Sequence, residues 1–304
     1  MIKRTLFVIN WQQFTERHRL WITEQAGKCD ELIFLIEDTQ LLPDGITPGA
    51  LLARIHSFLS SFIAIPFYLL PVPAKGVTPP YNWLRWRILC PPFQKVFTDN
   101  AVHQRAMEQA LRVPVTVLPP LAGVGVEIEP AGLEKSRGLF ITRAQPFHNG
   151  HLAFIEQMKA EVDELIIVIA MANRSHQLAD IATAGERLAM VLPVLEQTVP
   201  GRYYLAALPY SDFTMENIYE LEWLLPAFTR VYTTNPSVAV MAATAGYETV
   251  ALQQRLTVSS TLVRDGMVKG LPVDAYVPAT VLAFIQQHGI DRRLQQLHEK
   301  ENRG

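Results

Sequence analysis

The sequence is poor in cysteine: its 304 residues include only Cys29 and Cys90, without a CxxC pair or a histidine cluster at zinc spacing. This scarcity argues against a disulfide framework and a zinc site, and it predicts reduced thiols in a cytoplasmic protein. Charged residues make up only 18% of the chain against 49% hydrophobic residues, and there are only 16 glycines and 21 prolines. These proportions argue against a disordered, collagen-like or coiled-coil chain and predict a folded protein with room for two domains.

The sequence also has no strong net charge and no convincing membrane span. Its 27 basic and 29 acidic side chains give a net charge of −2, so we expect no nucleic acid partner. The uncharged stretch 57–74 contains three prolines, and we expect a helix end, a loop and a strand there. Residues 1–10 lack a small-residue cleavage site and predict a buried strand rather than a signal peptide. We therefore expect no membrane partner either.

The chain repeats itself at an offset of about half its length. Four segments recur in the same order, and the first two pairs share a spacing of 133 residues. The pairs are 4–9 with 137–142, 29–36 with 162–169, 47–53 with 183–189, and 92–100 with 227–235. This pattern predicts a tandem duplication, with domains at 1–134 and 135–304.

Within each copy, β-branched apolar runs alternate with segments of helical period, which is typical of βαβ units. Such units predict an α/β fold in which each domain is a parallel sheet with helices on both faces. In the second copy we expect strands at 139–142, 165–171, 203–208 and 230–233. We expect helices at 150–160, 184–195 and 277–288. Two further helices are expected, one between the last two strands and one that begins at about residue 259. We expect the polar tail from residue 291 to be a solvated helix end.

Two segments of the second copy are suited to bind phosphate. The first strand ends in the segment 142–151 (TRAQPFHNGH), which places His148 and His151 at a strand-to-helix turn, with Gly150 allowing backbone to approach a ligand. A helix amino terminus has unpaired N–H groups, and imidazoles beside it can donate hydrogen bonds to phosphate oxygens. The segment 259–264 (SSTLVR) offers hydroxyls and Arg264 at another helix start. Two such sites suit a triphosphate.

These segments together resemble the HxGH nucleotidylyltransferase superfamily, and most closely the archaeal-type nicotinamide mononucleotide (NMN) adenylyltransferases. The resemblance extends from about residue 137 to about residue 297. Its motifs are the QPFHNGH of 145–151, the SH of 175–176, the TAGER of 183–187, the RVYTTNP of 230–236 and the SSTLVR of 259–264. The resemblance implies two tandem Rossmann-like nucleotidylyltransferase domains, of which the second is catalytic.

The resemblance further implies that ATP transfers its adenylyl group to NMN or nicotinate mononucleotide, giving NAD or its deamido form and pyrophosphate, with Mg²⁺ entering beside ATP. No protein ligand for the metal is assigned. The catalytic residues it implies are His148, His151, Arg143 and Arg264. The ATP-binding residues it implies are Thr142, Gln145, Gly150, Ser259, Ser260 and Thr261. The acceptor-binding residues it implies are Asp212, Tyr219, Asn235, Ser175 and Arg187, the last two with structural roles as alternatives.

Two positions depart from the family pattern. Thr142 stands where the family usually has glycine, and Tyr219 stands seven residues after Asp212 where the family tends to have tryptophan. A different phosphorylated small-molecule acceptor is therefore an alternative, and a nucleotide sensor or scaffold without catalysis is another. By analogy with the rings of this family, a homo-oligomer is also possible, with the two copies forming an intramolecular pseudo-dimer.

The first copy has lost half of the histidine motif. Thr15 replaces the first histidine and Arg17 the glycine, while His18 remains. Residues 124–130 stand in place of SSTLVR and bring Glu127 and Glu129, whose charge would repel a triphosphate. We therefore expect this copy to be non-catalytic, either as a pseudo-dimer partner or as a regulatory site. Its aromatic residues line a pocket or belong to the core; they are Tyr81, Trp83 and Trp86.

Overall fold

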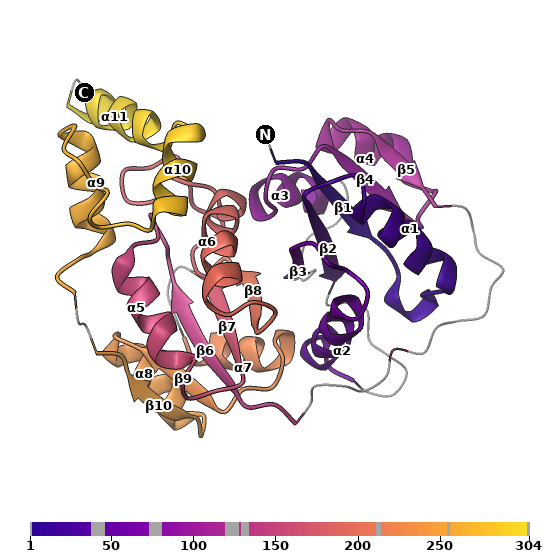
Figure 1. The fold of residues 1–304 in the computed structure, drawn as a ribbon, viewed down its shortest axis with the longest axis horizontal. Helices are drawn as coiled ribbons and strands as arrows, with labels where there is room; N and C mark the ends of the chain where they lie inside the picture. The colour runs from indigo at the N-terminus through magenta and orange to yellow at the C-terminus, as the bar shows by residue number, and fades with distance from the viewer. Residues whose placement is uncertain are drawn as a thin grey trace. The chain divides into compact units, whose positions relative to one another are not determined.

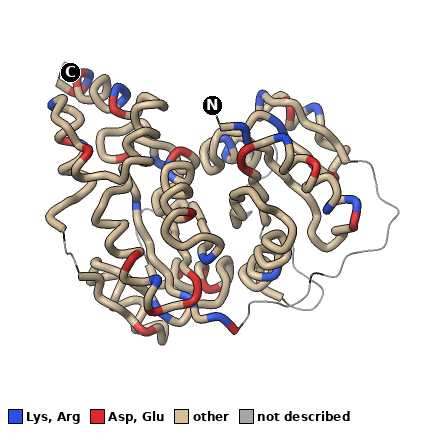
Figure 2. Tube along the Cα trace, in the orientation of Figure 1, with Lys and Arg blue, Asp and Glu red and all other residues tan. Residues whose placement is uncertain are grey.

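The computed structural model describes residues 2–37, 46–72, 81–118, 128, 134–210, 214–253 and 256–302 (Figure 1). The chain forms two compact units: 1–135 together with 219–228, and 136–218 together with 229–304. The predicted boundary between domains, at 134–135, stays a prediction. Lys and Arg lie interspersed with Asp and Glu in both units (Figure 2). None of the described helices is long and apolar enough to cross a membrane.

The first unit contains a parallel five-stranded sheet. Its spatial order is β3 (Phe67–Val72), β2 (Glu31–Glu37), β1 (Arg4–Val8), β4 (Lys95–Thr98) and β5 (Val115–Val117). Its helical segments are η1 (Trp11–Gln13), α1 (Glu16–Ala26), α2 (Pro48–Ser60), α3 (Tyr81–Leu89) and α4 (Gln104–Leu111). Because the strand order reverses direction between β1 and β4, right-handed crossovers place helices on both faces of the sheet.

The second sheet repeats this arrangement. Its spatial order is β8 (Tyr203–Ala207), β7 (Glu164–Ile169), β6 (Arg137–Thr142), β9 (Arg230–Thr233) and β10 (Glu248–Ala251). The helices of this half of the chain are α5 (Asn149–Met158), α6 (Ala184–Thr198), α7 (Met215–Leu224), α8 (Pro236–Thr244), α9 (Ser260–Val268), α10 (Ala279–Gln287) and α11 (Ile290–Glu301). When the five strands of each sheet are numbered from 1 to 5 in chain order, both sheets have the spatial order 3-2-1-4-5. The shared order supports the duplication, which stays a prediction.

A buried arginine, glutamate and tyrosine occupy matching places in the two sheets. They are Arg4, Glu31 and Tyr68 in the first sheet and Arg137, Glu164 and Tyr204 in the second. The arginine Nε lies 2.6 Å from the glutamate Oε2 in the first sheet and 2.8 Å in the second. The tyrosine hydroxyl donates to the same oxygen, at 3.0 Å and 3.1 Å. Each carboxylate thus has the partners that a buried charge requires.

The α/β prediction is confirmed, and the expected strands and helices of the second copy are present within a few residues. The helix α8 and the strand β10 were not predicted from the sequence. The strand β10 lies at the edge of the sheet and none of its residues is buried, so it lacks the apolar run that marked the others. The tail is a separate helix rather than only a solvated helix end. Gly289, at φ 62°, precedes α11, which buries Ile290 and Leu294.

Candidate active site

The turn between β6 and α5 is closed by the two histidines of the HxGH segment. His148 is the N-cap of α5, and its Nδ1 accepts a hydrogen bond from the Gly150 N–H at 3.1 Å. The His148 N–H in turn donates to His151 Nδ1 at 3.2 Å. The two rings stack with centroids 3.7 Å apart and an interplanar angle of 24°. The pair therefore caps the helix while it holds both rings in one fixed arrangement.

Gly150 makes room for this arrangement. A Cβ atom at this position would lie 2.9 Å from His148 Nδ1 and 3.2 Å from Val258 Cγ1. Such distances require the histidine ring or the valine to move. The close approach of the His148 ring is thus one structural reason for glycine here, and the predicted approach of a ligand to the backbone stays a prediction.

Both histidines are neutral at physiological pH. Burial lowers the pKa of His148 to about 4, and burial together with the nearby His148 lowers the pKa of His151 well below its ordinary value. Because each Nδ1 accepts a backbone hydrogen bond, we assign the proton of each ring to Nε2. The pair therefore supplies hydrogen-bond donors rather than positive charge.

The two Nε2–H groups have different surroundings. His151 Nε2 lies 2.9 Å from the hydroxyl oxygen of Thr142, which also accepts from the Ala144 N–H at 3.2 Å. Both ring nitrogens of His151 thus have partners within the turn, and Thr142 fixes the ring from the side opposite His148. Among the residues that the structure describes, the His148 ring stacks on His151 and hydrogen-bonds through Nδ1 alone, which leaves its Nε2–H for a ligand.

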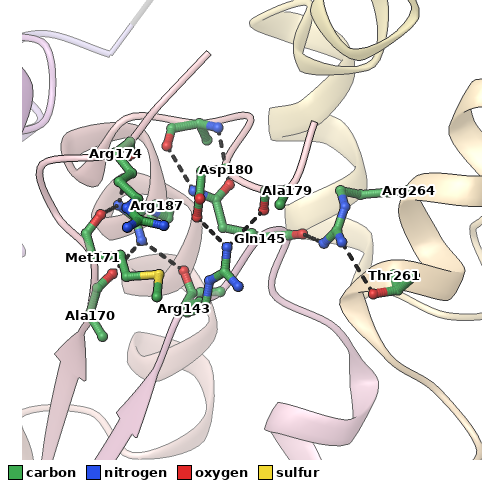
Figure 3. Close-up of polar contacts among 12 residues, drawn as sticks. Arg143, Gln145, Ala170, Met171, Arg174, Ala179, Asp180, Arg187, Thr261 and Arg264 are labelled. Atoms are coloured by element: carbon green, nitrogen blue, oxygen red, sulfur yellow. Dashed lines mark hydrogen bonds and ion pairs between the residues drawn. The ribbon is translucent and has the colours of Figure 1, made fainter. Parts of the chain in front are cut away.

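Two arginines supply the positive charge. Arg143 lies 2.5 Å from the buried carboxylate of Asp180, while its side chain is 42% exposed. Arg264 donates to the Gln145 carbonyl at 2.8 Å and to the Thr261 hydroxyl at 3.1 Å (Figure 3). Burial and then the charge of Arg143 lower the pKa of Arg264. An anion placed between the two guanidinium groups would relieve this repulsion.

The start of α9 packs directly on the histidine turn. Ser259 is the N-cap of α9, and its hydroxyl accepts from the Leu262 N–H at 3.1 Å. The Ser260 hydroxyl donates to the Pro146 carbonyl at 3.0 Å. With the bond from Arg264 to Gln145, these contacts unite the two segments that the sequence predicts to bind phosphate.

Two residues predicted to contact substrates are instead buried supports of the site. Gln145 is 1% exposed, and its amide exchanges two hydrogen bonds of 3.0 Å with the backbone of Ala182. Arg187 is fully buried, and burial lowers its pKa to about 10. Its guanidinium donates to the carbonyls of Arg143, Ala170, Met171 and Arg174. This geometry favours a positioning role for both side chains, which for Arg187 is the structural alternative given above, and the predicted ligand contacts stay predictions.

A cavity of about 190 Å³ lies beside the turn, at the carboxyl ends of β6, β7 and β9. Its lining brings together Thr142, Arg143 and Asn235, whose predicted roles stay predictions, and it also includes Tyr210, which no sequence motif indicated. Tyr219 lies on α7 with 56% of its surface exposed and does not line this cavity. The remaining predicted acceptor residues are Ser175, whose hydroxyl lies 3.0 Å from His176 Nδ1, and Asp212, which lies outside the described residues.

Known proteins resemble this chain over about half its length. A cytidylyltransferase-like family model matches residues 139–201. The nicotinamide-nucleotide adenylyltransferase of Thermococcus onnurineus is 36% identical over 160 residues, which cover 51% of this chain and 86% of that protein. The enzyme of the same name from Methanococcus maripaludis is 35% identical over 167 residues, covering 54% of this chain and 97% of that protein. The chain belongs to the nicotinamide-nucleotide adenylyltransferase family.

As a member of this family, the chain is a nucleotidylyltransferase, and the expected superfamily is confirmed. Among solved structures, the bifunctional NMN adenylyltransferase/ADP ribose pyrophosphatase of Francisella tularensis is similar with a TM-score of 0.49 and 14% identity, over 55% of this chain and 54% of that chain. A protein named as a putative nicotinate-nucleotide adenylyltransferase, from Vibrio parahaemolyticus, has a TM-score of 0.42 and 15% identity, over 52% of this chain and 96% of that chain.

The matching turn in the first unit of this nucleotidylyltransferase keeps one histidine. Thr15 is the N-cap of α1, and its N–H donates to His18 Nδ1 at 3.1 Å. His18 is 3% exposed, and its Nε2 has no hydrogen-bond partner in the described part of the chain. Asn10 stands where the second unit has Arg143. The predicted carboxylates Glu127 and Glu129 lie outside the described residues.

Proposed function

We propose that this protein transfers the adenylyl group of ATP to the phosphate of NMN or nicotinate mononucleotide, forming NAD or its deamido form and releasing pyrophosphate. The observation that carries this proposal is the convergence of His148, Arg143 and Arg264 on one strand-to-helix turn. The names of the relatives support the same chemistry.

The geometry suits in-line transfer between two anions. An oxygen of the acceptor phosphate attacks the α-phosphorus of ATP, and the bond from that phosphorus to the bridging oxygen of the β-phosphate breaks, so pyrophosphate leaves with the electron pair. The acceptor oxygen is already deprotonated, so no general base is required. His148 donates its Nε2–H to a phosphate oxygen, and Arg143 and Arg264 neutralise charge that grows in the transition state.

Mg²⁺ enters this scheme with ATP. The described residues contain no group of three or more His, Cys, Asp or Glu side chains arranged to hold a metal ion. Mg²⁺ commonly keeps several waters and binds substrate phosphates. We therefore propose that triphosphate oxygens and water supply its ligands, while the protein orients the phosphates.

The acceptor occupies the cavity beside the turn in this proposal. Arg143 lines that cavity and faces the acceptor phosphate, while Asn235 and Tyr210 contact the base and ribose. Asn235 is the N-cap of α8, and its side chain accepts from the Ser237 N–H at 2.9 Å, which fixes its orientation. The amide nitrogen remains available to donate to a carbonyl or carboxylate of the acceptor base.

The test is pyrophosphate release from ATP and Mg²⁺, with NMN and nicotinate mononucleotide in parallel reactions. We expect release that requires one of these acceptors and that falls about 100- to 1,000-fold in the His148→Ala variant, as for the loss of one oxyanion-hole donor. Thr15→Ala is the matched control, because Thr15 is the N-cap at the same place in the first unit.

Other outcomes separate the alternatives. ATP binding without release from either acceptor would contradict the proposal and lead to a panel of other phosphorylated acceptors. Binding without turnover across that panel would favour a nucleotide sensor. An equal loss in Thr15→Ala would contradict the assignment of the reaction to the second unit.

A further inference from the structure

The first unit contains a cavity of its own, of about 310 Å³, at the carboxyl ends of β1 and β4. Trp83 and Trp86 of α3 line it, together with Asn10, Asp99 and His103. In parallel α/β sheets, this end of the strands is where ligands bind, and the volume is at the lower end of the range for ligand pockets. Trp83 and Trp86 therefore belong to the core and also border a cavity, so both alternatives hold for them; the side chain of Tyr81 lies outside the described residues.

This cavity occupies the same place in its sheet as the cavity of the second unit, but its charge is reversed. Where Arg143 follows β6, the neutral Asn10 follows β1. Where the hydroxyl of Thr234 follows β9, the carboxylate of Asp99 follows β4. One cation is thus lost and one anion is gained relative to the second unit.

The charge of the first cavity disfavours phosphate. None of the described residues that line it is lysine or arginine. Asp99 Oδ2 accepts from the Asn10 N–H at 2.6 Å, which holds the carboxylate at the cavity wall. A phosphate group in this cavity would therefore face a fixed negative charge without a neutralising cation. A nucleotide is a poor occupant for this reason.

The aromatic lining favours a flat, positively charged ligand. The faces of tryptophan rings attract cations more strongly than those of other side chains, and a nearby carboxylate adds to that attraction. Trp86 is 1% exposed, yet its indole N–H has no hydrogen-bond partner among the described residues. A buried indole N–H normally has an acceptor, and a carbonyl oxygen on a ligand would provide one.

We propose that the first unit binds a small aromatic cation of the pyridinium class, bearing a carbonyl group and no phosphate, between its tryptophans and Asp99. The ring lies against Trp83, the positive charge faces Asp99, and the carbonyl accepts from the Trp86 indole. This site is separate from the reaction proposed above and does not depend on it.

Calorimetric titration of the full chain, without ATP, tests the site with three ligands of nearly equal shape. They are 1-methylnicotinamide, which is a cation, nicotinamide, which is neutral, and nicotinate, which is an anion. We expect saturable binding that weakens in this order. We further expect Asp99→Asn to weaken the cation about tenfold or more while leaving nicotinamide nearly unchanged.

Asp30→Asn is the matched control. Asp30 Oδ2 also accepts a backbone hydrogen bond, from the Lys3 N–H at 2.7 Å, but Asp30 precedes β2 at the opposite end of the same sheet. This variant should bind 1-methylnicotinamide like the unaltered chain. Equal weakening by Asp30→Asn and Asp99→Asn would contradict the proposal, because the effect would then be one of folding or overall charge.

A second variant keeps the test decisive if Asp99→Asn fails to fold. Trp83→Phe retains an aromatic ring but presents a weaker face to a cation, and we expect it to weaken binding of 1-methylnicotinamide about threefold. Absence of saturable binding at millimolar concentration, tighter binding of nicotinate, or affinity for the cation that neither variant changes would overturn the proposal. The last result would place the cation in the second unit.

Discussion

The turn after β1 and the turn after β6 share one hydrogen bond, from the N-cap N–H to the Nδ1 of a histidine three residues later. The distance is 3.1 Å at His18 and 3.2 Å at His151. The second turn adds a histidine at the N-cap itself and has Arg143 beside it, where the first turn has Thr15 and Asn10. The shared histidine therefore supports the turn, whereas the added residues supply the donors and charge that a phosphate reaction needs.

This comparison extends to the cores. Each sheet buries one arginine–glutamate pair at the same register, with a tyrosine hydroxyl on the same carboxylate oxygen. Burial raises the pKa of both Tyr68 and Tyr204, and the charge of the neighbouring glutamate raises it further. The two units thus share a buried group of arginine, glutamate and tyrosine, while the side chains at the carboxyl ends of their strands differ.

The largest expected effect is on stability, and it tests the buried arginine–glutamate pair that the two sheets share. Glu164→Gln and Glu31→Gln each leave a buried arginine without its counter-charge, so each should lower the free energy of unfolding by about 3–5 kcal/mol. Glu16→Gln, which removes an exposed ion pair with Arg19, should cost less than about 1 kcal/mol. Urea unfolding followed by circular dichroism measures all three. A large loss in only one of the two sheets would contradict the equivalence of the cores.

The next effect tests the difference in charge at the turns. Arg143→Gln removes a charge-assisted contact to substrate phosphate, which is worth about 1.5–3 kcal/mol, so kcat/KM for adenylyl transfer should fall about 10- to 100-fold. Asn10→Ala, at the matching place, should leave the same kinetics unchanged. Steady-state kinetics with varied acceptor and saturating ATP provide the measurement, and equal effects of the two substitutions would contradict the difference between the two turns.

A third effect follows from the neutral state of His148. Its pKa is about 4 in the folded protein and 6.5 ordinarily, so the unfolded chain binds the extra proton as the pH falls between these values. Stability contributed by the neutral ring is therefore complete above about pH 6.5 and decreases towards pH 4, with a slope of about 1.4 kcal/mol per pH unit. His148→Asn should reduce the pH dependence of the unfolding free energy by up to that slope. An unchanged slope would show that folding does not lower the pKa of His148.

The smallest expected effect concerns Thr142; the matching position in the first unit is Ile9. Thr142→Val keeps the shape of the side chain but leaves the buried His151 Nε2–H without its acceptor, which should cost about 1 kcal/mol of stability. Thr142→Ser retains the hydroxyl and should cost less. Thermal unfolding of the two variants gives the comparison, and a valine variant as stable as the serine variant would show that the hydrogen bond does not hold the ring.

Local signals explain what the sequence predicts well. The apolar run at 165–169 is buried throughout within β7, and Ser259 caps α9 as its position before a helical segment indicated. The histidine turn is equally local, because its hydrogen bonds join residues two or three positions apart. Such features depend on neighbours along the chain and can be recognised without the fold.

Other features depend on contacts between distant segments, so the sequence alone could not predict them. Asp180 pairs with Arg143 across 37 positions, and no local pattern distinguishes it from an exposed aspartate. Gln145 and Arg187 have the side chains of ligand-binding residues, but the fold buries both against backbone carbonyls or amides. Tyr210 lines the cavity only because β8 lies beside β7 in the sheet.

The most direct test of the central claim, that the second unit alone carries the reaction, is a matched pair of histidine substitutions. Steady-state adenylyl transfer would be measured for His151→Asn and His18→Asn, with circular dichroism to confirm folding. The account predicts that His151→Asn lowers kcat/KM about 100-fold or more, because the His148 ring loses its stacked support, while His18→Asn leaves kcat/KM unchanged. Equal losses, or a loss confined to His18→Asn, would contradict it.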